Sequence, residues 1–128
     1  MIRILLVEDH EEIWDFLSRR LRRRGYEVGL ATQGQEAVDK SRAESFDIVL
    51  LDMNLPVLDG WTVAGMMKQH PSTSQVPIIA LTAHAMAGDK EKVLAAGCDG
   101  YHPKPVDFPQ LVEQIELLVA RPATAVQG

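Results

Sequence analysis

Three features are scarce in this 128-residue chain, and each scarcity excludes a class of protein. Its single cysteine, Cys98, excludes an internal disulfide and a zinc site built from several cysteines, and we expect this thiol to be buried in the turn-like segment 97–100. No apolar stretch approaches the ~20 residues that a membrane helix needs, and the N-terminus turns acidic at Glu8, too early for a signal peptide. These absences predict a soluble, cytoplasmic protein with no membrane partner.

Positive charge is the third scarcity, because 13 basic residues face 18 acidic ones and leave a net charge of −5. General binding of nucleic acids depends on neutralising phosphates with Lys and Arg, so we expect no direct nucleic-acid partner. One segment departs from this balance, the basic run Arg19, Arg20, Arg22, Arg23 and Arg24. Such a run most often forms only the solvated face of a helix.

Short apolar runs alternate with helical patterns along the chain. The runs 4–7, 48–51 and 78–81 are typical of strands buried on both faces of a sheet. Between the first two, Ile13, Leu17 and Leu21 recur every fourth residue and predict an amphipathic helix that ends at Gly25. The other elements expected are strands at 27–31 and 100–102 and helices at 35–43, 61–69 and 87–96. A last helix should begin at Asp107, which together with Gln110 resembles a capping box, and should carry its buried face from Phe108 to Leu118.

This alternation of strand and helix predicts the fold class α/β, with a parallel sheet and helices on both faces. At 46% apolar residues, one domain of this length buries roughly two-thirds of its unfolded surface. We therefore expect a single domain over residues 1–120 and a short flexible tail over 121–128.

Each buried strand run leads into an acidic or hydroxyl residue. The run 4–7 is followed by Glu8 and Asp9, 48–51 by Asp52 and 78–81 by Thr82. Ligands of open parallel sheets bind outside the carboxyl ends of the strands, so these side chains should meet at one edge. The sequence therefore predicts the active site at this edge.

The electrostatics of three clustered carboxylates limit what the site can be. Carboxylates ~5 Å apart repel by roughly 3 kcal/mol at an effective dielectric constant of about 20, so either a shared proton or a divalent cation must neutralise them. An oxygen-only site with room for water suits Mg²⁺ best. Lys104 and Thr82 would complete a clamp for phosphoryl oxygens, with Asp52 as metal ligand, nucleophile or both.

Four motifs, taken together, resemble the response-regulator receiver domain, the phosphoacceptor module of two-component signalling. They are Leu6-Val7-Glu8-Asp9, Leu51-Asp52-Met53-Asn54-Leu55-Pro56 with Asp59-Gly60, Leu81-Thr82-Ala83, and Lys104-Pro105. The resemblance covers about residues 1–119 and implies a flavodoxin-like, doubly wound sheet with strand order 2-1-3-4-5. It also implies a cis peptide bond before Pro105.

The resemblance assigns the metal and phosphoryl chemistry to particular residues. Asp52 would take a phosphoryl group from the phosphohistidine of a histidine kinase or a histidine phosphotransfer protein, and Lys104 would pair with a phosphoryl oxygen. Mg²⁺, for which Mn²⁺ can substitute, would be held by Asp9, Asp52 and the backbone carbonyl of Asn54, with Glu8 acting through water. The protein would not be an enzyme for other substrates, since it catalyses only its own phosphorylation and dephosphorylation.

The resemblance also implies how the signal leaves the site. Thr82 and Tyr101 would rearrange on phosphorylation and change the surface of the fourth helix, fifth strand and fifth helix, which signals to a downstream protein target. A phosphorylation-dependent dimer of the chain is a further expected partner. Asn54 and His84 occupy positions that influence the lifetime of the aspartyl phosphate. In this family the first helix helps to dock the phosphodonor, so Arg19, Arg22 and Arg23 are candidates for partner docking.

Several alternatives remain open from the sequence. The strand-end acids can simply cap the following helices, and His10, His70 and His102 have no metal-ligand spacing and are expected at the surface. A small Mg²⁺-dependent phosphatase with an aspartyl intermediate would need a general acid where Asn54 stands. A receiver excised from a hybrid histidine kinase would carry the same motifs; the Met1-Ile2-Arg3 start favours a stand-alone regulator.

Overall fold

Five parallel strands form one sheet in the computed structural model, which describes residues 1–83 and 89–120. The strands are β1 (Arg3–Val7), β2 (Glu27–Ala31), β3 (Ile48–Asp52), β4 (Ile78–Thr82) and β5 (Gly100–Pro103). Their order is β2-β1-β3-β4-β5, and every neighbouring pair is parallel. The predicted sheet and strand order are therefore confirmed.

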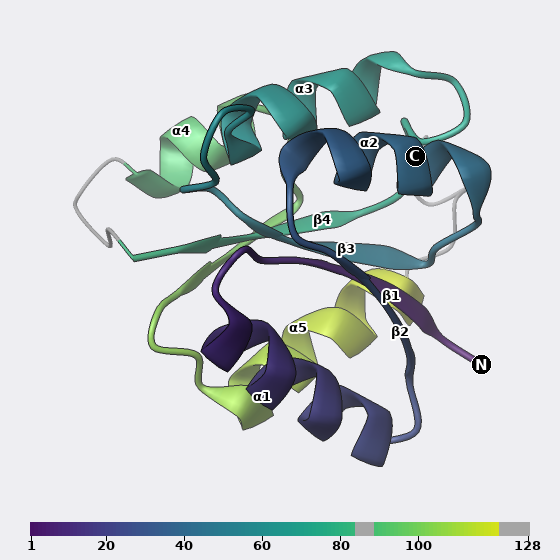
Figure 1. The fold of residues 1–128 in the computed structure, drawn as a ribbon, viewed down its shortest axis with the longest axis vertical. Helices are drawn as coiled ribbons and strands as arrows, with labels where there is room; N and C mark the ends of the chain where they lie inside the picture. The colour runs from purple at the N-terminus through teal and green to yellow at the C-terminus, as the bar shows by residue number, and fades with distance from the viewer. Residues whose placement is uncertain (84–88, 121–128) are drawn as a thin grey trace.

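Helices cover both faces of this sheet, as predicted. They are α1 (Glu11–Arg23), α2 (Gly34–Ala43), α3 (Gly60–Gln69), α4 (Asp89–Ala95) and α5 (Phe108–Ala120). Figure 1 shows α2, α3 and α4 on one face, and α1 and α5 on the other. The start predicted for the fourth helix, residues 87 and 88, lies outside the described residues. Over the ranges 1–83 and 89–120, no helix is long and apolar enough to cross a membrane.

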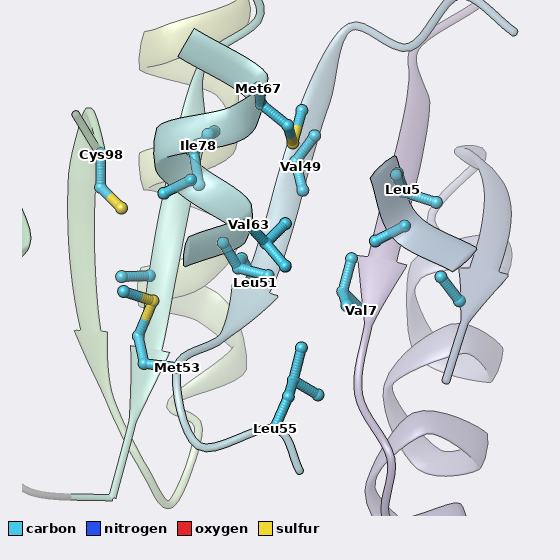
Figure 2. Packing of buried hydrophobic residues seen from close by; sticks show 14 of the residues in the cluster. Leu5, Val7, Val49, Leu51, Met53, Leu55, Val63, Met67, Ile78 and Cys98 are labelled. Atoms are coloured by element: carbon cyan, nitrogen blue, oxygen red, sulfur yellow. The ribbon is translucent and has the colours of Figure 1, made fainter. Parts of the chain in front are cut away.

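The central strands are buried on both faces because each face packs against a layer of helices. Every residue of β3 and β4 is buried, and alternate side chains enter two separate hydrophobic clusters. Figure 2 shows the cluster on the α3 side, where Val63 and Met67 of the helix approach Val49 and Leu51 of β3. Cys98 also belongs to this cluster, so its predicted burial is confirmed, and this burial raises the pKa of its thiol to about 12.

The start of α3 presses against the end of β3. A Cβ atom at Gly60 would lie 2.5 Å from the Cα of Met53 and 2.6 Å from the carbonyl oxygen of Asp52, so only glycine fits without a shift of the backbone. Asp59 caps the helix, because its side chain accepts a hydrogen bond of 2.8 Å from the N–H of Thr62. The end of β3, which carries Asp52, is thus packed closely against the start of α3.

Hydrogen bonds also connect α3 to the start of β4. The ammonium group of Lys68 donates to the carbonyl of Val76 at 2.9 Å and to the carboxylate of Asp99 at 3.0 Å. The same carboxylate oxygen accepts from the N–H of Ile78 at 2.9 Å. Lys68 and Asp99 therefore fix the loop that leads into β4.

The start of α5 differs from the predicted capping box. Asp107 accepts from the N–H of Gln110 at 3.2 Å, but the N–H of Asp107 donates to Nε2 of His102 at 3.1 Å. The other ring nitrogen, Nδ1, lies 2.6 Å from Oε1 of Gln114, so Nδ1 carries the proton of a neutral ring. His102 is only 1% exposed, and its predicted surface location is wrong because α5 covers β5.

Candidate functional site

The carboxyl ends of β1 and β3 bring the strand-end acids together. Val7 and Leu51 are partners in the parallel register, so Glu8, which follows β1, and Asp52, the last residue of β3, lie at the ends of adjacent strands. Glu8 is fully buried and Asp52 is 1% exposed, while the Asp9 side chain is about a quarter exposed. Ligand atoms of Glu8, Asp9, His10 and Asp52 all lie within 4.8 Å of one another. The predicted meeting of acids at one edge is therefore present.

Lys104 places one positive charge among these acids. Its ammonium nitrogen lies 2.6 Å from Oε1 of Glu8 and 3.5 Å from Oδ1 of Asp52. The peptide bond between Lys104 and Pro105 is cis, as the resemblance implies, and the N–H of Lys104 donates to the carbonyl of Thr82 at 2.7 Å. The lysine therefore bridges two carboxylates from different strands, with the shorter contact to Glu8.

One ammonium group does not satisfy all the carboxylate oxygens. Oδ1 of Asp52 accepts from the N–H of Asn54 at 3.0 Å, but Oδ2 of Asp52 and Oδ1 of Asp9 are buried with no hydrogen-bond partner among the described residues. Burial raises the pKa of Asp52, and the nearby charge of Glu8 raises it further, whereas the Asn54 N–H and Lys104 act in the opposite direction. Asp52 is therefore a buried carboxylate that favours a further positive charge.

These donors fit a divalent cation. Buried carboxylate oxygens without partners are unfavourable unless a proton or an ion compensates them, and hard oxygen ligands suit Mg²⁺. Asp9 and Asp52 supply the two unsatisfied oxygens, and Glu8 lies within the same cluster. The geometry thus supports an acidic cluster that could bind Mg²⁺.

His10 is the member of the cluster that sequence reasoning missed. Its side chain is 64% exposed, as a surface residue should be, yet Nδ1 lies 3.1 Å from Oε2 of Glu8 and 3.3 Å from Oδ1 of Asp9. These contacts raise the pKa of His10, first through the hydrogen bond to Glu8 and then through the charge of Asp9. The signal available in the sequence was its position directly after the acidic pair.

The other predicted site residues fall into three groups. Thr82 ends β4 beside β3 and is buried, and Tyr101 is a half-buried residue of β5 that packs against the α3-side core. His84 lies outside the described residues. The docking candidates Arg19, Arg22 and Arg23 are all exposed on α1.

Comparison with known proteins identifies the family to which this fold and acidic site belong. Residues 4–116 match the family model of the response regulator receiver domain, and the chain belongs to this family. It is a receiver domain of two-component signalling. The chain is 34% identical over 113 residues to the polar-differentiation response regulator DivK of Brucella ovis, a match that covers 88% of this chain and 92% of DivK.

A second relative is the hybrid signal transduction histidine kinase G of Dictyostelium discoideum. It is 38% identical over 113 residues, which cover 86% of this chain but only 3% of that kinase. The family membership therefore concerns the receiver module and not the activities of the rest of the kinase.

Two solved structures are similar to this chain in fold and sequence. The receiver domain of the sensor histidine kinase PA1611 from Pseudomonas aeruginosa, with a magnesium ion coordinated in the active site cleft, is 36% identical with a TM-score of 0.87 and covers 94% of this chain and 98% of its own. The second structure is the Saccharomyces cerevisiae co-crystal structure of Ypd1 with the receiver domain of Ssk1. The matching chain is 33% identical with a TM-score of 0.81, and the match covers 89% of this chain and 86% of that chain.

Proposed function

We propose that this receiver takes a phosphoryl group from a phosphohistidine onto Asp52, with Mg²⁺ bound, and transmits the change to a partner protein. One observation carries the proposal: Oδ2 of Asp52, at the end of a central strand, is buried with no hydrogen-bond partner among the described residues, and Lys104 lies 3.5 Å from Oδ1 of the same carboxylate. A carboxylate in this position costs stability unless a cation or an electrophile meets it. A phosphoryl group with its cation supplies both.

The transfer is a displacement at phosphorus. An oxygen of Asp52 forms the new P–O bond as the N–P bond of the phosphohistidine breaks, and the electron pair stays on the imidazole nitrogen, which then takes up a proton. Lys104 donates to one phosphoryl oxygen and the hydroxyl of Thr82 donates to another, which stabilises the charge spread over the transferred group. When bound, Mg²⁺, or Mn²⁺ in its place, supplies positive charge that offsets the carboxylates.

The cation would be held by Asp9, Asp52 and the backbone carbonyl of Asn54, with Glu8 acting through water. Oδ1 of Asp9 and Oδ2 of Asp52 are buried and accept no hydrogen bond from the described residues, which supports the first two ligands. The magnesium ion in the active site cleft of the PA1611 receiver supports the choice of metal. Mg²⁺ would therefore occupy this site during the transfer.

The conformational change on phosphorylation would pass from Thr82 to Tyr101. Lys104 links the two regions, because its N–H donates to the carbonyl of Thr82 at 2.7 Å and it follows β5, the strand of Tyr101. We propose that both residues rearrange on phosphorylation and alter the α4, β5 and α5 surface for a downstream protein target or for a second phosphorylated copy. Asn54 and His84 would adjust how long the phosphoryl group survives.

The phosphodonor would be a histidine kinase or a histidine phosphotransfer protein that docks on α1. The co-crystal structure of a phosphotransfer protein with the receiver domain of Ssk1 supports such a partner. A hollow of about 280 Å³ lies between α1 and the segment after β5, lined by apolar side chains that include Phe16 and Val106. Phe16 is 53% exposed, and the guanidinium carbon of Arg20 lies over its ring, 5.4 Å from the ring centroid. An apolar helix face edged with acids would fit this surface.

Charge reversal on α1 tests the docking. The triple variant Arg19→Glu, Arg22→Glu and Arg23→Glu should slow phosphoryl transfer from the cognate histidine donor about ten-fold or more, because complementary charge mainly sets the association rate. Phosphorylation by a small donor should not change. Arg42→Glu, an exposed change on α2 at the opposite face, is the matched control. Equal slowing with both donors would contradict the docking role.

Mass spectrometry tests the phosphoacceptor role. The purified chain is incubated with Mg²⁺ and acetyl phosphate, and the intact mass is followed with time. The wild type should gain one phosphoryl group, and neither Asp52→Asn nor the wild type with a chelator should gain it. An unchanged adduct on Asp52→Asn, or none on the wild type, would refute the proposal.

A further inference from the structure

His10 gives the cation site a nitrogen atom beside its carboxylates. Nδ1 lies 3.1 Å from Oε2 of Glu8 and 3.3 Å from Oδ1 of Asp9. We propose that His10 serves as a metal ligand, so that the site binds a first-row transition ion such as Zn²⁺ more tightly than Mg²⁺. This inference rests on the proposed cation site and adds the identity of a second class of ion.

The spacing of the donors supports a tetrahedral ion. Zinc bonds to nitrogen and carboxylate oxygen of about 2.0–2.2 Å place tetrahedral ligands about 3.3–3.6 Å apart. The two distances from His10 are at or slightly below this range, and the ligand atoms of all four residues lie within 4.8 Å. A four-coordinate site therefore requires that the longer separations, which reach at most 4.8 Å, shorten by up to about 1.2 Å.

An independent observation shows that the site favours a cation. Oδ2 of Asp52, a residue only 1% exposed, has no hydrogen-bond partner among the described residues, and neither has Oδ1 of Asp9. Glu8 keeps Oε2 directed to His10 while its other oxygen pairs with Lys104. The cluster thus offers one nitrogen and three carboxylate oxygens without disturbing the Glu8–Lys104 pair.

The chemistry of the ligands separates the two ions. Imidazole suits Zn²⁺, Ni²⁺ and Cu²⁺, whereas Mg²⁺ prefers carboxylates, carbonyls and water, so His10 adds affinity for the first group only. The two ions would share Asp9 and Asp52 and would therefore exclude each other. An ion held by four protein ligands also has no open position for a phosphoryl oxygen, so Zn²⁺ would compete with phosphorylation.

Calorimetric titration of a chain without a polyhistidine tag tests the inference. Zn²⁺ and Mg²⁺ are titrated separately into the wild type, His10→Asn and His70→Asn. Asparagine is favoured at a helix N-cap, the position of His10, so the variant should fold. His70 caps the far end of α3 and contacts Ser72, and it serves as the matched control.

His10→Asn should weaken Zn²⁺ binding about ten-fold or more, since loss of residues that only support metal ligands already costs about 10–100-fold. Mg²⁺ affinity should stay within about two-fold, and His70→Asn should change neither ion. The Co²⁺ complex should give visible absorption bands that change in His10→Asn alone.

Two results would overturn the inference. One is equal Zn²⁺ affinity in the wild type and His10→Asn with Mg²⁺ binding intact, which leaves the proposed cation site standing. The other is no binding of either ion to the wild type, which removes that site as well. Retained Mg²⁺ binding by His10→Asn shows that the variant is folded.

Discussion

Asp52→Asn should stabilise the metal-free protein. At an effective dielectric constant of about 20, each carboxylate of Glu8 and Asp9 within 4.8 Å repels Asp52 by roughly 3.5 kcal/mol, and Lys104 at 3.5 Å attracts it by roughly 4.7 kcal/mol. The balance is a net repulsion of about 2 kcal/mol, to which desolvation of the buried carboxylate adds. Asparagine removes this penalty, and its oxygen can still accept from the N–H of Asn54.

The pH dependence has a definite sign. Folding raises the pKa of Asp52, so the folded state binds its proton more tightly than the unfolded state does. The contribution of Asp52 to stability is therefore most favourable below its unfolded pKa of about 4 and is lost as pH rises through the higher folded value. The advantage of Asp52→Asn should accordingly be largest at alkaline pH and should shrink as pH falls through that window.

Urea unfolding in the presence of a chelator measures this effect. Wild type, Asp52→Asn and the exposed control Asp39→Asn are compared over a pH series that extends well above the raised pKa of His10, where its ring is neutral. Asp52→Asn should raise the free energy of unfolding by about 2 kcal/mol, and Asp39→Asn should change it by less than about 0.5 kcal/mol. A metal-free Asp52→Asn protein no more stable than the wild type would refute the electrostatic reasoning.

Three further substitutions test the fold around the site by urea unfolding. Val57→Gly should stabilise by about 0.5–1 kcal/mol, because this fully exposed β-branched residue has a φ of 66° in the left-handed region; a loss of stability would contradict this. Gly60→Ala should cost about 1–3 kcal/mol, since its Cβ would overlap Met53, and should also slow phosphorylation by acetyl phosphate. Lys68→Met should cost about 2 kcal/mol by breaking its ties to Val76 and Asp99, while the exposed Lys92→Met should cost less than about 0.5 kcal/mol; equal effects would argue against the tie.

The sheet was predictable because continuous apolar runs have few alternatives in a chain of this length. The runs 4–7, 48–51 and 78–81 all form central strands, and the acids that follow them meet where the parallel topology requires. The strand 100–102 extends one residue further, to Pro103.

Pairings across long stretches of chain were less predictable. The sequence predicts that Lys104 lies near the acids. It does not predict that the closest partner of Lys104 is Glu8, 96 residues away. His102 was expected at the surface because the sequence shows no metal-ligand spacing around it, whereas α5 buries it and supplies Gln114 as its partner. His10 has no metal-ligand spacing on a helix or strand, and only the turn after β1 brings its ring back to Glu8. These contacts depend on tertiary packing, which periodicity does not encode.

Chemical mapping of the phosphorylated residue tests the central claim most directly. The chain is treated with acetyl phosphate and Mg²⁺ and then reduced with borohydride, which converts an aspartyl phosphate to homoserine, and its peptides are sequenced by mass spectrometry. We predict homoserine at position 52 alone, and only when Mg²⁺ is present. Homoserine at Asp9 instead, or an unmodified Asp52 in a protein that binds Mg²⁺, would contradict the account.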